Sequence, residues 1–515
     1  MGIEISPMVL TVIAVYFVTS TYLLAAAAIT ARAPKPNEHS RRLFYVLVVP
    51  ALNEELVIGN TVRHLLTLKG DNYLVLIIDD GSNDRTGDVV RSFPPGKVRL
   101  LTRRAPFARQ GKGEALNHAY RTVLTSELPE IYGADNIVFS VMDADGQVPG
   151  DMLDRVAPYF ADPHTAAVQV GVRMLNAKVN VFTRWQQYEF VTFNWLFSRA
   201  RESLGSVSLG GNGQFVRMSA LASLREGPWT DCLTEDLDIG LRLMLLGWRN
   251  RYCHETQVYQ QAVPSPKRLV RQRSRWYQGH LTCWKLIPRI LVSDWPAHRK
   301  ADVLNYLIAP GLVLPMGVFS LVVIVLSLVP GASPLNGRGG PATASTILTW
   351  YVLSMGAAPL FAIALWRAKE SGLVASIFWA HLFLLGSYIW LVAGVLAVKR
   401  MITGRAGWIK TARTAIGDMP IAPAGAGTAA ESKYVAWTST NDVPEQTGTL
   451  LGIRAANFLP RTGADYASDD YAAPPRGEAS MPAALLLARG EARLARLDRL
   501  VAASSQHTSR PLAEV

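Results

Sequence analysis

The chain has 515 residues, with 52 Lys and Arg against 40 Asp and Glu, and therefore a formal charge of +12. Charged residues make up 18% of the chain and the mean hydropathy is +0.15, whereas an ordinary soluble domain has roughly 25% charged residues. These values exclude a disordered chain, a collagen-like chain and a small disulfide scaffold, and they disfavour a purely soluble protein.

The cysteines and the excess of basic residues indicate which cellular environment and which partners to expect. Cys232, Cys253 and Cys283 have neither the number nor the spacing of a disulfide framework or a zinc site, so we expect a reducing environment around them. Positive charge is compatible with nucleic acid, anionic lipid or an anionic substrate. No zinc finger, helix-turn-helix or RNA-binding signature accompanies it, so we expect no nucleic-acid partner.

The first element in chain order is an apolar segment over residues 5–29. A secretory signal peptide, the alternative for such a segment, carries its positive charge before the apolar core. Here the basic residues follow the core, as Arg32, Lys35, Arg41 and Arg42. We therefore expect residues 1–42 to form a transmembrane helix and a basic linker, with the linker in the cytoplasm because flanking Lys and Arg stay on that side.

Residues 43–280 are predicted to form a cytoplasmic α/β domain. Four apolar, strand-like runs end in polar or acidic residues, at 43–51, 73–81, 97–102 and 136–145. Helical patterns lie between them, at 54–68 and 111–124. Alternation of strand and helix predicts a mostly parallel sheet. In such sheets ligands bind outside the carboxyl ends of the strands, where the acidic residues fall.

Membrane-associated segments are expected after this domain. Residues 281–300 mix Trp, Leu and Ile with basic residues over a length too short to span, which predicts an interfacial helix or, alternatively, a buried helix of the soluble domain. Three apolar stretches follow within residues 301–400, at 303–328, 346–366 and 373–398. Each is long enough to cross about 30 Å of hydrocarbon.

The charges after the last stretch bear on the topology. Basic residues lie between 399 and 413, and by the same charge rule they belong in the cytoplasm. Three complete crossings would put them outside, so we expect two crossings and one interfacial or re-entrant helix in a multi-pass protein of the cell membrane. Residues 401–419 are then a cytoplasmic segment, and 420–515, rich in Ala, Gly and Pro, are typical of a largely disordered tail.

Two pairs of acidic residues directly follow strand-like runs. Asp79 and Asp80 lie in "IIDDGSNDRT", and Asp143 and Asp145 lie in "VMDADGQ". Residues two apart at a strand end point their carboxylates to one side, and such oxygens suit Mg²⁺ or Mn²⁺ bound to substrate phosphates. Either pair alone is compatible with a simple turn or helix cap. Together they favour a nucleotide and metal site.

Two later motifs combine acidic, basic and aromatic residues. In "LTEDLDIGLRLMLLGW", Thr234, Glu235 and Asp236 precede a helical run. They are either an N-cap with acidic first-turn residues or they supply a general base for a sugar hydroxyl. The segment "RLVRQRSRWYQGH" places Trp276, a flat face for a sugar ring, beside guanidinium groups that suit a diphosphate. These groups belong to Arg268, Arg271, Arg273 and Arg275. The alternatives are a basic membrane-surface patch and a nucleic-acid patch.

With these residues in place, the chain resembles the membrane-integrated, processive family-two glycosyltransferases, the group of cellulose, chitin, hyaluronan and poly-N-acetylglucosamine synthases. The motifs that carry the resemblance occur in family order, as "VPALNEE", "DDGSNDRT", "DAD", "GGNGQFVR", "TED", "QRSRW" and "WIKTAR". Each motif is weak alone, but the ordered set is specific. The resemblance implies a GT-A-type α/β fold combined with an α-helical transmembrane bundle, a UDP-sugar donor and inversion at the anomeric carbon.

On the matching positions, the resemblance implies a set of donor-binding residues. They are Glu54, Asp80, Lys112, Asp143, Gln272, Arg275, Thr411 and Arg413. Glu54 and Asp80 would contact the uridine part, and Asp143 the nucleotide. Asp145 would hold the Mg²⁺ or Mn²⁺ ion that bridges the diphosphate.

The same resemblance assigns the catalytic and acceptor residues. Asp236 would deprotonate the acceptor hydroxyl, with Glu235 beside it in the catalytic motif. Trp276 would lie under the acceptor sugar, and Gly211 and Asn212 of "GGNGQFVR" would line the acceptor side.

The implied function is processive transfer from a UDP-sugar to a growing β-linked polysaccharide that is moved across the lipid bilayer. The alternative is a single transfer to a lipid-linked acceptor. Two departures from the family pattern leave the base, sugar and linkage open. Leu52 replaces an aromatic residue that packs on uracil in many relatives, and "GGNGQFVR" lacks a Cys found in several synthases. An inactive scaffold is disfavoured because Asp145, Asp236 and Arg275 are intact.

Overall fold

A computed structural model describes the part of the chain that carries most of the motifs. The described residues are 7–35, 37, 39–224, 227–327, 351, 355–386 and 388–404. Thr411 and Arg413, which were expected to close over the donor, lie outside the described residues, as does the predicted tail at 420–515.

A seven-stranded sheet forms the centre of the α/β domain, with the strand order β3-β2-β1-β4-β6-β5-β7. The strands are β1 Phe44–Ala51, β2 Tyr73–Asp79, β3 Val98–Thr102, β4 Ile137–Val141, β5 Thr165–Met174, β6 Gln214–Arg217 and β7 Arg249–Gln260. β1 to β4 pair in parallel, β6 runs antiparallel to β4 and β5, and β5 pairs with β7 in parallel. The predicted mixed, mostly parallel sheet is therefore confirmed.

Both faces of the sheet are buried, as the continuous apolar runs predict. Along β1, Leu47 packs into one core cluster with residues of α2 and α6, whereas Val48 packs into another with residues of α4 and α10. Successive residues of a strand point to opposite faces, so one apolar run serves both clusters. The helices around the sheet are α2 Ile58–Leu65, α3 Thr86–Arg91, α4 Lys112–Leu124, α5 Leu128–Tyr132, α6 Met152–Val156, α9 Met218–Ala222 and α10 Glu235–Leu245, with 3₁₀ turns at His39–Arg42 and Ala157–Ala161.

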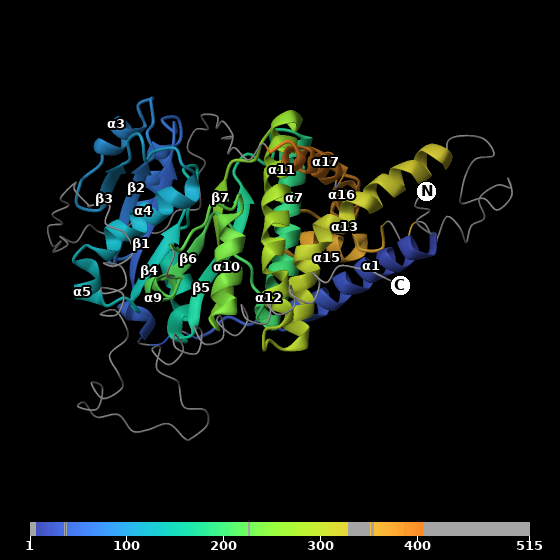
Figure 1. Cartoon of the computed structure of the whole chain (residues 1–515), viewed down its shortest axis with the longest axis horizontal. Coiled ribbons are helices and arrows are strands. Elements are labelled where there is room, and N and C mark those ends of the chain that lie inside the picture. Colours follow the sequence, from blue (N-terminus) through green and yellow to red (C-terminus); the bar gives the residue numbers. More distant parts are fainter. Residues whose placement is uncertain are drawn as a thin grey trace, which may run out of the picture.

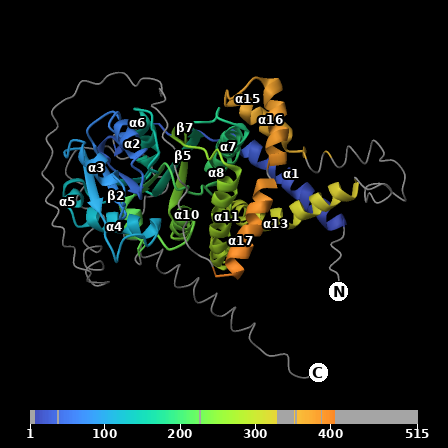
Figure 2. The same cartoon turned by 90° about the horizontal axis from the view of Figure 1, so that it is seen from above.

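The other helices gather on one side of the domain, beyond β7 (Figures 1 and 2). Within this group α7 packs against β5, α11 along α17, and α1 against α8. A π-helical turn, Phe193–Ser198, joins α7 to α8. The helices are α1 Pro7–Ile29, α7 Val181–Thr192, α8 Arg199–Leu204, α11 Pro266–Thr282, α12 Ile287–Leu291, α13 Ala297–Ser327, α15 Ala358–Arg367, α16 Leu373–Gly386 and α17 Tyr388–Ile402.

Residues 281–300 differ from the single interfacial helix that we expected. α11 ends at Thr282, a 3₁₀ turn and α12 follow, and α13 has begun by Ala297. Cys283, Leu286 and Ile290 are buried in one cluster with apolar residues of α10 and α13. One face of the segment thus packs against α10 and α13, whereas Trp284, Leu291 and Val292 are exposed, so the interfacial role of 281–300 stays a prediction.

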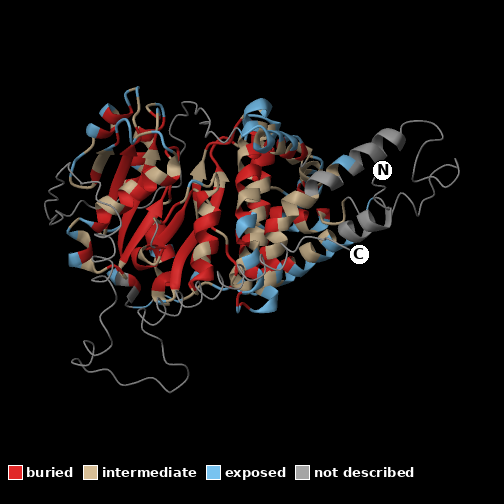
Figure 3. Ribbon diagram, viewed as in Figure 1, coloured by how far each residue is buried: buried red, intermediate tan, exposed pale blue. Residues whose placement is uncertain are grey.

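The apolar stretches are only partly realised as membrane-spanning helices. Among the described residues, Leu373–Ile402 is long and apolar enough to cross a membrane, whereas Val15–Ile29 and Ala358–Arg367 are apolar but shorter. This part of the chain therefore does not support the expected transmembrane bundle or the multi-pass arrangement. The outer surface of these helices is nevertheless apolar, since Val374 is 82% and Phe378 63% exposed, in contrast to the buried sheet (Figure 3).

Candidate active site

A cavity of about 890 Å³ opens at the carboxyl ends of β1, β2 and β4 and extends to α7, α11, α13 and α17. Most of the site residues expected from the sequence line it. They are Glu54, Asp80, Lys112, Asp143, Gly211, Asn212, Glu235, Asp236, Gln272, Arg275 and Trp276. Leu52 also lines this cavity, whereas Asp145 is not part of its wall. Motifs that are spread over residues 54–276 thus converge on one cavity.

The end of the cavity that contains Glu54, Asp80 and Asp143 is where the donor is expected, and it is called the donor end below. There, Asp80 is held in place by two basic residues. The Arg103 guanidinium donates to Asp80 Oδ1 at 2.6 Å, and the backbone N–H of Arg109 donates to the same oxygen at 3.1 Å. Nearby, the N–H of Glu54 donates to the Thr86 hydroxyl at 2.8 Å. Neither Arg103 nor Arg109 was predicted, because an isolated arginine outside a motif resembles any surface arginine.

Asn212 connects the end of β4 to the end of β7. The N–H of Asp143 donates to Asn212 Oδ1 at 3.1 Å, and Asn212 Nδ2 donates to Gln260 Oε1 at 2.8 Å. Asn212 is 5% exposed. The residue therefore fixes the loop that carries Asp143, a role that the motif alone does not reveal.

The two carboxylates of the "DAD" motif take different environments. Asp143 lines the cavity, and its Oδ1 accepts from Lys112 Nζ at 2.9 Å. Asp145 is buried, and its Oδ2 accepts from the N–H of Gln261 at 2.8 Å. Of the two side chains, Asp143 therefore faces the cavity, whereas the metal-binding role expected of Asp145 stays a prediction.

A divalent cation was expected at this motif. Within the described residues, no three His, Cys, Asp or Glu side chains are grouped to hold a metal ion. Mg²⁺ in nucleotide sites is usually bound by one or two carboxylates together with substrate phosphates and water. Asp143 and Asp145 offer carboxylate oxygens of this kind, which would hold such an ion together with ligands from a substrate.

Lys112 links the donor end to the catalytic motif. Its Nζ donates to Asp143 Oδ1 and to the carbonyl of Gly211, each at 2.9 Å, and lies 3.7 Å from Glu235 Oε1. Burial alone lowers the pKa of Lys112, but the carboxylates of Asp143, Glu235 and Asp236 outweigh it and raise this pKa above its ordinary value. Lys112 is therefore a fixed positive charge between the two halves of the site.

Gly211 allows this close arrangement. A Cβ atom at this position would lie 3.2 Å from Lys112 Nζ and 3.4 Å from Asp236 Oδ2. A side chain here would therefore press on the Lys112 ammonium group and touch the Asp236 carboxylate.

Asp236 lies in the first turn of α10. Burial, and then the charge of Glu235, raise the pKa of Asp236 to about 7, although Lys112 acts in the opposite direction. A carboxylate that titrates near neutral pH is suited to act as a general base. Thr234, the N-cap residue, makes no side-chain capping hydrogen bond, but Glu235 and Asp236 do lie in the first turn, and Asp236 Oδ1 accepts from the N–H of Leu237 at 2.9 Å.

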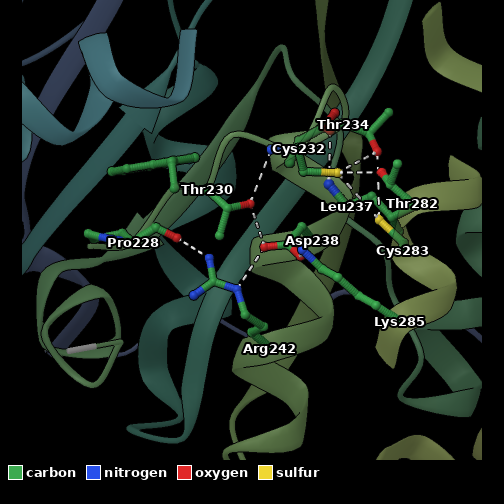
Figure 4. A network of polar contacts seen from close by, with 12 residues as sticks. Pro228, Thr230, Cys232, Thr234, Leu237, Asp238, Arg242, Thr282, Cys283 and Lys285 are labelled. Carbon is green, nitrogen blue, oxygen red and sulfur yellow. Dashed lines mark hydrogen bonds and ion pairs between the residues drawn. The ribbon is translucent and has the colours of Figure 1, made fainter. Parts of the chain in front are cut away.

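A buried polar network holds the start of α10 (Figure 4). Asp238 is fully buried and accepts from the Thr230 hydroxyl at 3.0 Å and from Arg242 Nε at 2.7 Å, and its other oxygen lies 3.3 Å from Lys285 Nζ. Beside it, the free thiols of Cys232 and Cys283 lie 3.8 Å apart. The loop before Asp236 is therefore tied to the connector that follows α11.

The other end of the cavity is aromatic. Each ring there comes from the helical side of the molecule, and the residues are Phe190, Phe193, Trp276, Tyr277, His280, Tyr306 and Trp390. Burial lowers the pKa of His280 to about 4, so this residue is neutral at physiological pH. Charged groups thus cluster at the donor end, and uncharged rings form most of the opposite end.

Arg273 corrects one sequence-based expectation. We expected the arginines of "RLVRQRSRW" to face a diphosphate, and Arg275 does line the cavity. Arg273 is completely buried, is absent from the cavity wall and forms an ion pair with Glu189 of α7. The charge of Arg273 is therefore used inside the protein and not on the ligand.

Comparison with known proteins adds to this geometry. Residues 42–279 match the family model described as glycosyltransferase like family 2. The beta-monoglucosyldiacylglycerol synthase of Synechocystis sp. is 36% identical over 274 residues, which are 51% of this chain and 53% of that protein. The chain thus spans about half the length of that relative. A solved mannosyltransferase from Pyrobaculum calidifontis, in complex with GDP-Man and Mn²⁺, has 17% identity and a TM-score of 0.47, and the match covers 73% of this chain and 99% of that one.

A second relative matches over a larger share. The beta-monoglucosyldiacylglycerol synthase of Trichormus variabilis is 32% identical over 340 residues, which cover 63% of this chain and 69% of that protein. Residues 42–279, which match the family model, contain the sheet and the acidic and basic residues at the donor end of the cavity. The chain accordingly belongs to glycosyltransferase family 2, and it is a sugar-transferring enzyme with a GT-A-like α/β domain.

Proposed function

We propose that this enzyme transfers a single glucose residue from UDP-glucose to the hydroxyl of diacylglycerol in a lipid bilayer. The observation that carries the proposal is the identity of three relatives, which are 36%, 32% and 33% identical and all bear the name beta-monoglucosyldiacylglycerol synthase. These relatives favour the single-transfer alternative over the processive polysaccharide synthesis that the motifs led us to expect.

The aromatic end of the cavity supports an uncharged acceptor. Diacylglycerol offers one hydroxyl on an apolar body, and apolar and aromatic walls with few polar groups suit such a ligand. Trp276, Phe193 and Tyr306 provide walls of this kind close to the catalytic motif. The adjoining helices α16 and α17 carry exposed apolar side chains, which is compatible with delivery of the acceptor from a membrane.

We assign Asp236 the role of general base. Asp236 takes the proton of the acceptor hydroxyl while the oxygen attacks the anomeric carbon from the face opposite UDP. The bond from this carbon to the diphosphate breaks, and UDP leaves with the electron pair. An α-linked donor therefore gives a β-linked product without a covalent intermediate.

The proposed donor residues surround the leaving group. Glu54 and Asp80 contact the uridine part, Asp143 and Lys112 lie on the diphosphate side, and Arg275 neutralises charge as UDP departs. Gln272, Thr411 and Arg413 are further donor-binding residues in this proposal. A divalent ion held by Asp143 and Asp145 would supply Lewis-acid stabilisation of the diphosphate.

The test uses the full-length enzyme in phosphatidylcholine vesicles that contain diacylglycerol. Radiolabelled UDP-glucose, UDP-N-acetylglucosamine and GDP-mannose are supplied separately with Mg²⁺ or Mn²⁺, and the organic phase is separated by thin-layer chromatography. We expect a lipid with one sugar from UDP-glucose and no product from the Asp236→Asn enzyme. A water-soluble polymer, or a ladder of longer products, would overturn the proposal and support the processive alternative.

A further inference from the structure

A glutamate on α7 joins three helices at the aromatic end of the cavity. Glu189 Oε1 accepts from the indole N–H of Trp390 on α17 at 2.8 Å, and Glu189 Oε2 forms the ion pair with Arg273 on α11. The side chain of Glu189 is 14% exposed and that of Arg273 0%. The pair is thus shielded from solvent, where breaking it leaves an uncompensated buried charge.

Arg273 in turn supports the tryptophan of the "QRSRW" motif. Its guanidinium lies over the Trp276 ring, 4.0 Å from the ring centroid, and 5.4 Å from the centroid of Trp390. The two indole centroids are 6.5 Å apart, with the rings inclined at 35°. The guanidinium therefore holds both rings through cation–π contacts.

Only some members of this group reach the cavity. Trp276, Trp390 and Glu189 line it, whereas Arg273 does not. Arg273 thus covers the protein side of Trp276 and leaves the remaining ring surface to a ligand. Trp390 adds a second indole wall, and it belongs to Leu373–Ile402, the stretch long and apolar enough to cross a membrane.

We propose that Trp390 is a further acceptor-binding residue and that Glu189 is a positioning residue that orients Trp276 and Trp390 through one shared carboxylate. The inference rests on the proposed lipid acceptor and deepens it. Placing one wall of the site on an apolar helix that borders a bilayer lets a membrane lipid reach Asp236 without leaving the hydrophobic environment.

The first test is Trp390→Phe in the full-length enzyme. This change keeps an aromatic ring and the Glu189–Arg273 ion pair but removes the indole N–H donor. Loss of one hydrogen bond to a charged group predicts a rise of about tenfold in the KM for diacylglycerol, with the KM for UDP-glucose and the rate of UDP-glucose hydrolysis unchanged.

Trp379→Phe is the matched control. Trp379 lies on α16, packs on Tyr188 with ring centroids 5.0 Å apart, and is not part of the cavity wall. We expect neither KM to change in this variant.

Glu189→Gln tests the positioning role. We expect it to raise the KM for diacylglycerol by more than Trp390→Phe does, because Arg273 loses its counter-charge and both rings lose their orientation. Glu370→Gln is its control, since Glu370 pairs with Arg173 and Gln187 away from the cavity. Both variants should lower the melting temperature, but only Glu189→Gln should change the ratio of the two KM values. If Glu189→Gln fails to fold, the comparison of Trp390→Phe with Trp379→Phe still decides.

The results distinguish a failure of the proposed function from a failure of the roles proposed for Trp390 and Glu189. A wild-type enzyme that does not glucosylate diacylglycerol contradicts the proposed function. A wild-type enzyme that does so, together with a Trp390→Phe variant whose KM values are both unchanged or both raised equally, overturns the inference alone.

Discussion

Asp236 owes its chemistry to its surroundings, because burial and the neighbouring Glu235 both favour its protonated form. Its pKa of about 7 means that the base is protonated and inactive at acidic pH and ionised at alkaline pH. We therefore predict that kcat/KM rises with pH and levels off above neutrality, with an apparent pKa near 7 in initial-rate measurements. A profile that is flat through neutral pH would contradict this role.

The same residue gives a sharper test by substitution. Asp236→Asn removes the base while keeping the size of the side chain, so we expect transfer to be abolished and UDP binding, measured by calorimetry, to be retained. Loss of UDP binding in this variant would show that Asp236 serves the donor and not the acceptor hydroxyl.

Asp145 allows the proposed metal site to be tested separately from folding. Asp145→Ala removes both the expected metal ligand and the acceptor for the Gln261 N–H, whereas Asp145→Asn keeps an oxygen for that hydrogen bond. We expect both variants to lose the increase in UDP affinity that Mn²⁺ provides, in titrations with and without the ion. If Asp145→Asn retains this increase, Asp145 is a structural residue.

At this scale the sequence motifs predicted the residues of the cavity well, because family order and residue type locate Asp80, Asp143, Asp236 and Trp276 directly. Residues that act through others were missed. Arg103 holds Asp80, and Glu189 pairs with Arg273, but neither Arg103 nor Glu189 was singled out from a motif. Their partners lie on other helices and strands, so the spacing of residues along the sequence could not reveal these contacts.

At the scale of elements, α10 depends on the anchoring of Asp238. Its carboxylate is fully buried and bound by Thr230, Arg242 and Lys285. We predict that Asp238→Ala lowers the free energy of unfolding by about 3 kcal/mol, since it leaves the half-buried Arg242 charge without its partner.

Asp88→Ala is the reference for that measurement. The Asp88–Arg91 pair is solvent-exposed, with 72% and 59% of the two side chains accessible, so its loss should change the stability by less than about 0.5 kcal/mol. Equal effects of the two substitutions in denaturant unfolding would contradict the anchoring role of Asp238.

Helices and strands were predicted best where the local sequence alone determines them. β1, β2, β3 and β4 follow from apolar runs that are buried on both faces, and each begins within one residue and ends within four residues of the expected position. The segment 281–300 was different. An apolar face with basic residues suits a membrane surface and a protein surface equally, and in the structure Leu286 and Ile290 pack with α10 and α13 while Leu291 and Val292 are exposed.

At the scale of the whole molecule, the apolar outer surface lies on the helices beyond β7. We predict that the double substitution Val374→Asp and Phe378→Asp reduces vesicle binding by at least about tenfold, because an aspartate is strongly disfavoured in hydrocarbon. Flotation of the full-length protein with liposomes measures the bound fraction.

Ile131→Asp serves as the comparison for flotation. Ile131 is 49% exposed on α5 of the α/β domain, so a charge there should leave vesicle binding unchanged. If both enzymes float like the wild type, the surface formed by α16 does not contact the bilayer.

The division of the cavity between two parts of the chain has a consequence for how such enzymes diversify. The family match ends at residue 279, whereas Tyr306, Pro310 and Trp390 complete the aromatic end. If this end binds the acceptor as proposed, we expect substitutions in α13 and α17 to exchange one acceptor for another while every motif residue stays the same. Enzymes that share these motifs would then differ in their acceptor through helices that lie outside the family match.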